Sequence, residues 1–377
     1  MSISRGISPK ALLWNEFPIT AENFGEGCLG RSMKAMSLRK IAALHAQPDP
    51  LHLVECPIPE PGPGEIRIKV ITCGVCHTEL DEIEGRTPPP HLPIIPGHQV
   101  VGHIDKLGPK VSDRQLGERV GVAWIYSACG ECKWCRTGRE NLCPGYRATG
   151  RDVDGGYAEF MVAPAAFAHP IPAIFTAAEA APLLCAGAIG YRSLRLAQLQ
   201  PGAPLGLTGF GASAHLVLKL VRHLYPELPV YVFARSKAER HFARELGAAW
   251  AGESSEQPPE LLQAIIDTTP AWKPVINALR LLEPGGRLVI NAIRKENNDR
   301  NLLAGIDYPR DLWLEKTIQS VANVSRADVR EFLALAAEIP LHPTIEEFPL
   351  ADANRALREL KERKIRGAKV LRIGLDV

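Results

Sequence analysis

Short apolar runs separated by glycine and proline dominate the chain from about residue 33 to residue 184. β-Branched and aromatic residues fill these runs, as in EIRIKVI, QVVGHIDKLG, ERVGVAWI and YAEFMVA. Turn signals recur at regular intervals, and no long helical stripe interrupts them. This pattern predicts an antiparallel or barrel-like β domain.

The pattern changes near residue 177. Residues 177–198 are rich in Ala, Leu and Arg and predict a helix, and the next segment reads as a strand, a tight turn and a second helix. Strand and helix then alternate as far as RLVINAI. This alternation predicts a parallel sheet with crossover helices, a doubly wound α/β domain. Two helices and two short strands after about residue 321 are expected to complete the first domain.

Residues 1–32 have no clear period and contain scattered glycine and serine. They are interpreted as a poorly ordered extension or, alternatively, as a segment before a natural start at Met33. The predicted organisation is therefore an extension over 1–32, a β-rich domain over 33–186 and 322–377, and a doubly wound domain over 187–321.

Composition narrows the class of protein. The chain has 377 residues, which suits two domains, and its hydrophobic and charged contents of 46% and 23% are those of a globular protein. A net charge of +2 gives no strong field toward nucleic acid or membrane, so neither is expected as a partner. No apolar run approaches the roughly 20 residues that span a bilayer. Nine cysteines without a secretion signal favour thiols and metal ligands in a reducing, cytoplasmic location.

Four of the cysteines follow the spacing C-x2-C-x2-C-x7-C, namely Cys129, Cys132, Cys135 and Cys143. Four thiolates this close in the chain can close a tetrahedron around one zinc ion. A site with four sulfur ligands has no open position, so its predicted role is to make a lobe at about residues 127–145 rigid. The alternative is that these cysteines are unligated or redox-active. It is disfavoured because four exposed thiols on one loop would oxidise readily.

A second set of ligands is predicted around ITCGVCHTEL (71–80) and PGHQVVG (96–102). A catalytic zinc needs three protein ligands and one open position. The candidates are Cys73 or Cys76, His77 or His98, and Cys185. Spacing alone does not choose between the neighbouring cysteines, and Cys185 taken alone reads as a small core residue.

The segment GLTGFGASA (206–214) matches a dinucleotide-binding turn through Gly209, Gly211 and Ala214. It follows a predicted strand and opens a predicted helix, which is the context that the motif requires. At the end of the next strand the chain has Arg235 and Ser236 where an acidic residue would bind the hydroxyl of an NAD ribose. Arg235 can pair with a 2′-phosphate, so NADP is favoured over NAD.

Together these features resemble the zinc-containing medium-chain alcohol dehydrogenase family, from about Met33 to the C-terminus. The most specific match is Gly97-His98-Gln99-x-x-Gly102-x5-Gly108-x2-Val111, close to the family pattern G-H-E-x2-G-x5-G-x2-V. The CGVCHT loop, the four-cysteine lobe, DGGYAEF and the glycine turn follow in the family's order. The resemblance implies a GroES-like catalytic domain, a Rossmann cofactor domain, two zinc ions per chain and a homodimer or homotetramer.

The resemblance also assigns individual residues. It aligns Cys76, His98 and Cys185 with the catalytic zinc ligands and leaves Cys73 as a loop thiol. It aligns Thr78 with the hydroxyl that binds the substrate oxygen, and Glu79 with an acid that orients the ligand histidine. The resemblance further implies that His77 and Arg366 contact the cofactor phosphates. Trp124 is expected either to line an apolar substrate pocket or to pack in the core.

Three residues depart from the family pattern. Gln99 replaces a glutamate, Asp81 stands where many members place a proton-relaying histidine, and Ile189 replaces a threonine near the nicotinamide. We expect Asp81 to accept a proton, or the relay to run through the cofactor ribose and water. The reaction implied is the interconversion of primary or secondary alcohols with aldehydes or ketones by hydride transfer. The alternatives are a zinc-free quinone or enone reductase of the same fold, and a non-catalytic nucleotide-binding redox sensor.

Overall fold

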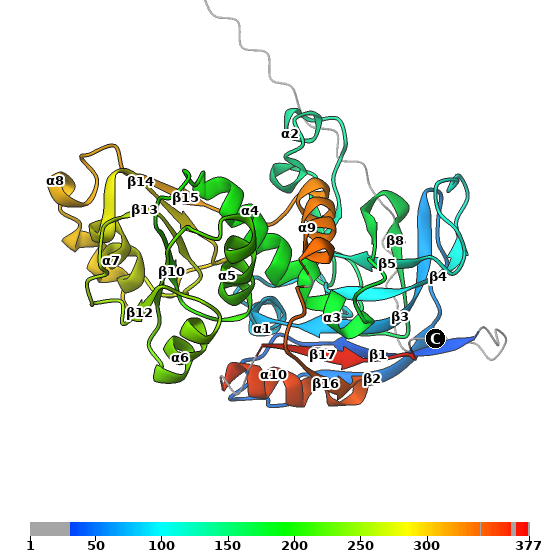
Figure 1. Ribbon diagram of the computed structural model, residues 1–377. Coiled ribbons are helices and arrows are strands. Elements are labelled where there is room, and N and C mark those ends of the chain that lie inside the picture. Colours follow the sequence, from blue (N-terminus) through cyan, green and yellow to red (C-terminus); the bar gives the residue numbers. More distant parts are fainter. Residues whose placement is uncertain (1–30, 340, 363–366, 376–377) are drawn as a thin grey trace, which may run out of the picture. The chain divides into compact units, whose positions relative to one another are not determined.

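The computed structural model describes residues 31–339, 341–362 and 367–375, and its residues from Ser32 onward form one compact unit. The predicted extension falls largely on residues 1–30, outside the described residues, and the first strand begins at Ser32. Two large sheets organise the unit (Figure 1). The predicted boundaries at residues 186/187 and 321/322 stay predictions.

The first large sheet is entirely parallel and has six strands, as the alternation of strand and helix predicts. In spatial order the strands are β12 (Trp250–Gly252), β11 (Val230–Phe233), β10 (Leu205–Thr208), β13 (Leu262–Asp267), β14 (Leu282–Ile290) and β15 (Thr317–Ser320). All residues of β10 and β11 are buried, which explains why these strands are continuous apolar runs. The helices of this part are α4 (Ala188–Ala197), α5 (Ala212–Leu224), α6 (Lys237–Glu245), α7 (Lys273–Leu281), α8 (Tyr308–Asp311) and α9 (Arg326–Glu338).

The second large sheet has seven strands and is mostly antiparallel, which confirms the β-rich prediction. Its strands are β16 (Ile345–Pro349), β17 (Ala368–Arg372), β3 (Glu65–Val75), β4 (Val100–Leu107), β5 (Arg119–Val122) and β9 (Ala168–Pro170), with β8 (Phe160–Pro164) also paired to β3. Strand β17 pairs with β3 although about 300 residues separate them in the chain. The C-terminal segment therefore completes the sheet that the N-terminal half begins.

Smaller elements surround this sheet. Two two-stranded sheets join β1 (Ser32–Leu38) to β2 (Leu51–Pro57) and β6 (Ile125–Ser127) to β7 (Arg147–Ala148). The helices are α1 (His77–Ile83), α2 (Lys133–Arg136), α3 (Ala177–Pro182) and α10 (Ala353–Lys361). Among the residues described, no helix is long and apolar enough to cross a bilayer.

The predicted helix over residues 177–198 is interrupted by a different helical form. Residues Leu183–Gly187 make a π-helix, η3, between α3 and α4. Pro182 lies directly before it and has no backbone N–H to continue the α-helical pattern. Such wide turns occur frequently at functional sites, and this one carries Cys185.

Candidate metal centre and cofactor turn

Cys76, His98 and Cys185 converge from three separate parts of the chain. Cys76 is the N-cap of α1, His98 lies just before β4, and Cys185 lies in η3. His98 Nε2 is 3.7 Å from the sulfur of Cys76 and 3.3 Å from that of Cys185, and all three ligand atoms lie within 4.8 Å of one another. Tetrahedral zinc with ordinary bond lengths places sulfur and nitrogen ligands about 3.6 Å apart. The donor set therefore fits one zinc ion.

The neighbouring thiol does not belong to this set. Cys73 is completely buried and lies within β3, so the prediction of a loop thiol is wrong in its location. A Cβ atom added at Gly97 would lie 2.8 Å from the Cys73 sulfur, which shows how tightly the strand packs there. Cys76 follows the end of β3, where the chain is free of the sheet. The turn from strand to helix therefore separates the two cysteines that spacing could not.

Glu79 fixes the orientation of the His98 ring. Its Oε1 lies 2.6 Å from His98 Nδ1, and its Oε2 accepts the backbone N–H of Cys76 at 2.8 Å. Both side chains are buried, at 0% and 1% exposure. With Nδ1 occupied by the carboxylate, Nε2 is the ring nitrogen that faces the two sulfurs.

The electrostatics of the pair follow from this contact. Burial alone raises the pKa of Glu79, but His98 outweighs it and the pKa lies below its ordinary value. Burial lowers the pKa of His98, but Glu79 and Cys76 outweigh it, and the pKa lies well above its ordinary value. The Cys185 thiol and burial raise the pKa of Cys76. A metal ion that binds here must therefore displace protons from its ligands.

The other residues predicted near the metal are all close to α1. Thr78 lies in its first turn, and its backbone N–H donates to the Cys76 sulfur at 3.4 Å. Gln99 is buried against Gly74, and its Nε2 has no hydrogen-bond partner among the described residues. Asp81 is buried and pairs with two arginines, Arg86 at 2.5 Å and Arg294 at 2.9 Å.

Aromatic side chains cover one side of the histidine. The Trp124 ring lies 6.4 Å from the His98 ring, and the Tyr146 ring lies 5.9 Å from Trp124. The buried Nε1 of Trp124 has no hydrogen-bond partner among the described residues. An aromatic wall beside the ligands is suited to an apolar substrate.

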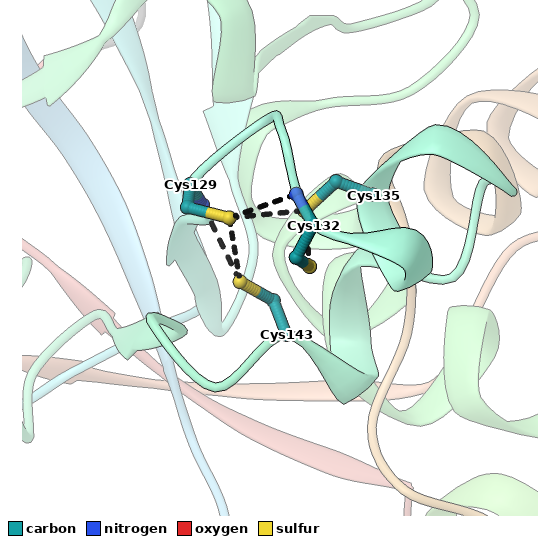
Figure 2. Close-up of side chains that lie close together, drawn as sticks. All are labelled: Cys129, Cys132, Cys135 and Cys143. Carbon is teal, nitrogen blue, oxygen red and sulfur yellow. Dashed lines mark hydrogen bonds between the residues drawn. The ribbon is translucent and has the colours of Figure 1, made fainter. Parts of the chain in front are cut away.

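The four cysteines of the predicted lobe form a second cluster, which Figure 2 shows. Their sulfurs lie 3.4 Å apart for Cys143 and Cys129, 3.6 Å for Cys132 and Cys135, and 3.9 Å for Cys129 and Cys135. Tetrahedral zinc with four thiolates requires about 3.8 Å. Backbone N–H groups of Cys132 and Cys129 also donate to sulfurs of the cluster. The chemistry of the four donors fits a structural zinc ion.

The lobe is tied to the segment between β15 and α9. Glu140 accepts from the Arg326 side chain at 2.7 Å, and Asn141 donates to the Ala322 carbonyl at 2.7 Å. Asn323 donates to the hydroxyl of Tyr146, whose ring contacts Trp124. We therefore infer that the lobe stiffens two things: the segment that connects the two large sheets, and the aromatic wall beside His98.

The glycine turn has the backbone that its sequence predicts. Gly209 has a φ of +80°, and a Cβ atom there would lie 2.7 Å from Thr268 Oγ1. Gly211 is the N-cap of α5, and a Cβ atom there would meet nothing within 4 Å. Ala214 is fully buried in the helix. A tight turn, an open approach and close helix packing are the three features that a pyrophosphate site needs.

The remaining predicted cofactor residues have different settings. Arg235 is exposed after β11, whereas the Ser236 hydroxyl accepts the Glu239 N–H at 3.0 Å as a helix cap. His77 is exposed at the start of α1. Arg366 lies outside the described residues.

Sequence reasoning missed a polar network below the glycine turn. Buried Asp267 accepts from the Thr208 hydroxyl at 2.5 Å and pairs with Lys295. Lys295 also donates to the Thr269 carbonyl at 2.7 Å. The sequence does contain one signal for this network: Asp267 ends an apolar strand, and a charge buried there requires a partner.

Comparisons with known proteins show what the chain is similar to. Residues 62–173 match the family model described as "Alcohol dehydrogenase GroES-like domain". The chain is 43% identical to a probable alcohol dehydrogenase, AdhA, of Mycobacterium tuberculosis, over 86% of this chain and 93% of that protein. It is 32% identical to an alcohol dehydrogenase of Geobacillus stearothermophilus, over 89% of this chain and all of that protein.

Solved structures give the same result. A thermostable alcohol dehydrogenase from Pyrobaculum aerophilum superposes with a TM-score of 0.81 at 25% identity, over 91% of this chain and all of that one. A cobalt- and zinc-bound structure of a thermostable alcohol dehydrogenase from the same organism gives a TM-score of 0.78 at 25% identity, with the same coverage.

Proposed function

Because the chain belongs to the family of zinc-containing alcohol dehydrogenases, we propose that Cys76, His98 and Cys185 hold its catalytic zinc ion. The chain is a zinc-dependent enzyme that interconverts alcohols with aldehydes or ketones, using a nicotinamide cofactor. The observation that carries the assignment is the convergence of two thiols and one imidazole within 4.8 Å. Zinc bound there supplies a Lewis acid for the substrate oxygen.

The chain's own residues prepare this site. Glu79 holds the His98 ring with Nε2 toward the two sulfurs. Thr78, in the same turn of α1 as Cys76, is the hydroxyl that we assign to the substrate proton. Gln99 is buried next to the ligand histidine and contributes an amide dipole without charge.

Four further cysteines support a second zinc ion in each chain. Cys129, Cys132, Cys135 and Cys143 offer four sulfurs at tetrahedral spacing, and no position is left for a substrate. We assign this ion a structural role, which its contacts to the segment before α9 support.

For the cofactor we propose the turn at Gly209, Gly211 and Ala214 as the pyrophosphate site, with His77 and Arg366 as phosphate contacts. NADP is favoured because Arg235 follows β11 where an acidic residue would repel the 2′-phosphate. The exposed Arg235 side chain is free to meet that phosphate, whereas the Ser236 hydroxyl is engaged as a helix cap.

Replacing Arg235 by alanine is expected to lower kcat/KM for NADPH about tenfold and to change kcat/KM for NADH by less than about twofold. The reason is that only NADPH carries the 2′-phosphate that the guanidinium would bind. Steady-state kinetics with both cofactors and one aldehyde test this expectation. Arg240→Ala is an unsuitable control because Arg240 donates to the Ala234 carbonyl, so exposed Lys237 serves instead.

The substrate that we propose is a medium-sized or aromatic alcohol or aldehyde. Trp124 and Tyr146 support this because the Trp124 ring lies edge-on to His98 and the Tyr146 ring packs against Trp124. The experiment is a screen of alcohols and aldehydes with NADPH and NADH, repeated after zinc is removed with a chelator. We expect turnover that chelation abolishes and added zinc restores.

Two other functions make different predictions for the same screen. A zinc-free quinone or enone reductase would keep its activity after chelation, but the complete set of three ligands disfavours it. A redox sensor would bind the cofactor and turn over no alcohol. Chelator-resistant turnover, or binding without turnover, would each overturn the proposal.

We also propose that the enzyme is a homodimer or homotetramer. Strand β15 is an edge of the parallel sheet, and Ile318 on it is 43% exposed. Trp313 and Leu314, just before the strand, are 62% and 47% exposed. An open edge beside exposed apolar side chains is typical of an interface. Light scattering should give two or four chains per particle. The cytoplasmic location stays a prediction from cysteine usage.

A further inference from the structure

One buried carboxylate joins the helix of the metal site to the parallel sheet. Asp81 lies on α1, which begins directly after Cys76, and its side chain is 5% exposed. Its Oδ1 accepts from Nε of Arg294 at 2.9 Å and from Nε of Arg86 at 2.5 Å. Arg294 follows β14, on the other large sheet. This ion pair therefore bridges the part of the chain with the metal ligands and the part with the glycine turn.

The pairing leaves the outer donors of Arg294 available. Only Nε meets Asp81, and the nearest other carboxylate is Glu296, which lies 4.0 Å from Nη1 and is 42% exposed. Nη2 has no partner within the described ranges of the chain. An exposed pair at that distance contributes little. Asp81 thus orients the guanidinium and leaves one of its edges unoccupied.

The other arginine is held differently. Arg86 pairs with Glu84 as well as with Asp81, and Glu84 also pairs with Lys361 at the end of α10. Arg86, Glu84 and Lys361 thus form a row of alternating charges that anchors Asp81 on the side away from Arg294. Asp81 Oδ1 accepts a hydrogen bond from each of the two arginines, so this oxygen is already engaged as an acceptor.

The location of Arg294 indicates what it meets. Ligands of doubly wound sheets bind outside the carboxyl ends of the strands, and β14 lies two strands from β10, whose end carries the glycine turn. The segment after β14 contacts both parts, because Asn291 donates to the Ser213 hydroxyl just after the glycine turn and Arg294 donates to Asp81. We therefore expect a molecule that reaches from that turn to Cys76 and His98 to pass this segment. Guanidinium groups bind oxyanions through two parallel N–H bonds.

We propose that Arg294 binds an oxyanion of the bound reactants and that Asp81 positions it instead of relaying a proton. The inference rests on the proposed function, because the reactants are those of an alcohol dehydrogenase. Two sources share this chemistry: a phosphate of the nicotinamide cofactor, and a carboxylate on the substrate. The two have different experimental signatures.

The cofactor source is tested by binding alone. The dissociation constant of NADPH is measured by calorimetry for the zinc-loaded wild type and for Arg294→Met, Arg294→Lys, Asp81→Asn and Arg86→Met. If a phosphate is bound, Arg294→Met raises the dissociation constant about tenfold or more, Asp81→Asn raises it less, and Arg294→Lys recovers part of the loss. Arg86→Met is the matched comparison, because it removes the other arginine from Asp81 but keeps the proposed phosphate donor. Since Arg86 helps to anchor Asp81, we expect a small effect, less than about threefold and below that of Asp81→Asn.

The substrate source is tested with a pair of aldehydes. Benzaldehyde and 4-carboxybenzaldehyde differ only in the carboxylate. If that group is bound, Arg294→Met lowers kcat/KM for 4-carboxybenzaldehyde about tenfold or more and leaves benzaldehyde within about twofold. Asp81→Asn is expected to lower kcat/KM for 4-carboxybenzaldehyde by a smaller factor and likewise to leave benzaldehyde unchanged.

Two results would overturn the inference. The first is an unchanged NADPH dissociation constant together with equal losses for both aldehydes. The second is an Asp81→Asn enzyme with normal NADPH binding and a displaced pH–rate profile, which would make Asp81 the proton relay. Thermal melting and zinc content establish that each variant is folded. If the wild type reduces no aldehyde, the proposed function fails, while the NADPH binding series still decides whether Arg294 meets a phosphate.

Discussion

Replacing His98 by alanine is expected to lower kcat/KM for NADPH-dependent aldehyde reduction by about three orders of magnitude, and Cys76→Ser by about two. Loss of a ligand weakens zinc binding and so removes the Lewis acid, which stabilises the transition state by several kcal/mol. Each 1.36 kcal/mol lost lowers the rate tenfold. His98→Ala carries an added cost, because it leaves the fully buried Glu79 carboxylate without its partner. Steady-state kinetics and zinc content per chain measure both effects.

The matched control is Cys73→Ala. Cys73 is a fully buried thiol on the strand that precedes Cys76, but it lies outside the set of ligands. We expect this variant to keep its zinc and to stay within about threefold of the wild-type rate. Undiminished reduction by His98→Ala, with two zinc ions still bound, would show that the ligands have been assigned wrongly.

Replacing Cys132 by serine is expected to remove one zinc ion per chain and to lower the melting temperature by about 5 °C. Structural zinc sites stabilise small peptides by about 10–16 kcal/mol, and only part of this applies to a lobe within a large domain. A loss of about 4 kcal/mol corresponds to a shift of about 5 °C at this size. The destabilisation should extend beyond the lobe, because Glu140 and Asn141 tie the lobe to the residues that lead into α9.

Cys56→Ala provides the comparison for the lobe. Cys56 is half-buried in β2, and its sulfur makes one long hydrogen bond within the described part of the chain, to the Met33 carbonyl at 3.9 Å. We expect an unchanged zinc content and a melting temperature within about 2 °C of the wild type. A Cys132→Ser protein that still binds two zinc ions and melts normally would exclude the structural role.

The features that are local in the chain were available from the sequence. The four lobe cysteines occupy one short segment, so their spacing alone limits how far apart the sulfurs can lie. The glycine turn is equally local, because Gly209 needs a positive φ and the adjacent strand and helix have clear periods. The alternation of strand and helix gave the parallel sheet for the same reason. The family resemblance then selected Cys76, His98 and Cys185 from several candidates.

The contacts between residues that are far apart in the chain were decided only by the tertiary structure. Cys185 reads as an ordinary core residue until η3 brings its sulfur 3.3 Å from His98 Nε2. The sequence offers Asp81 as a proton acceptor, and only the structure shows that Arg294, more than 200 residues later, donates to it. The spacing of residues in a sequence constrains only groups within a few turns of each other, whereas these partners meet because two sheets pack together. A sequence pattern can therefore point to candidate ligands, but the folded chain determines what each of them contacts.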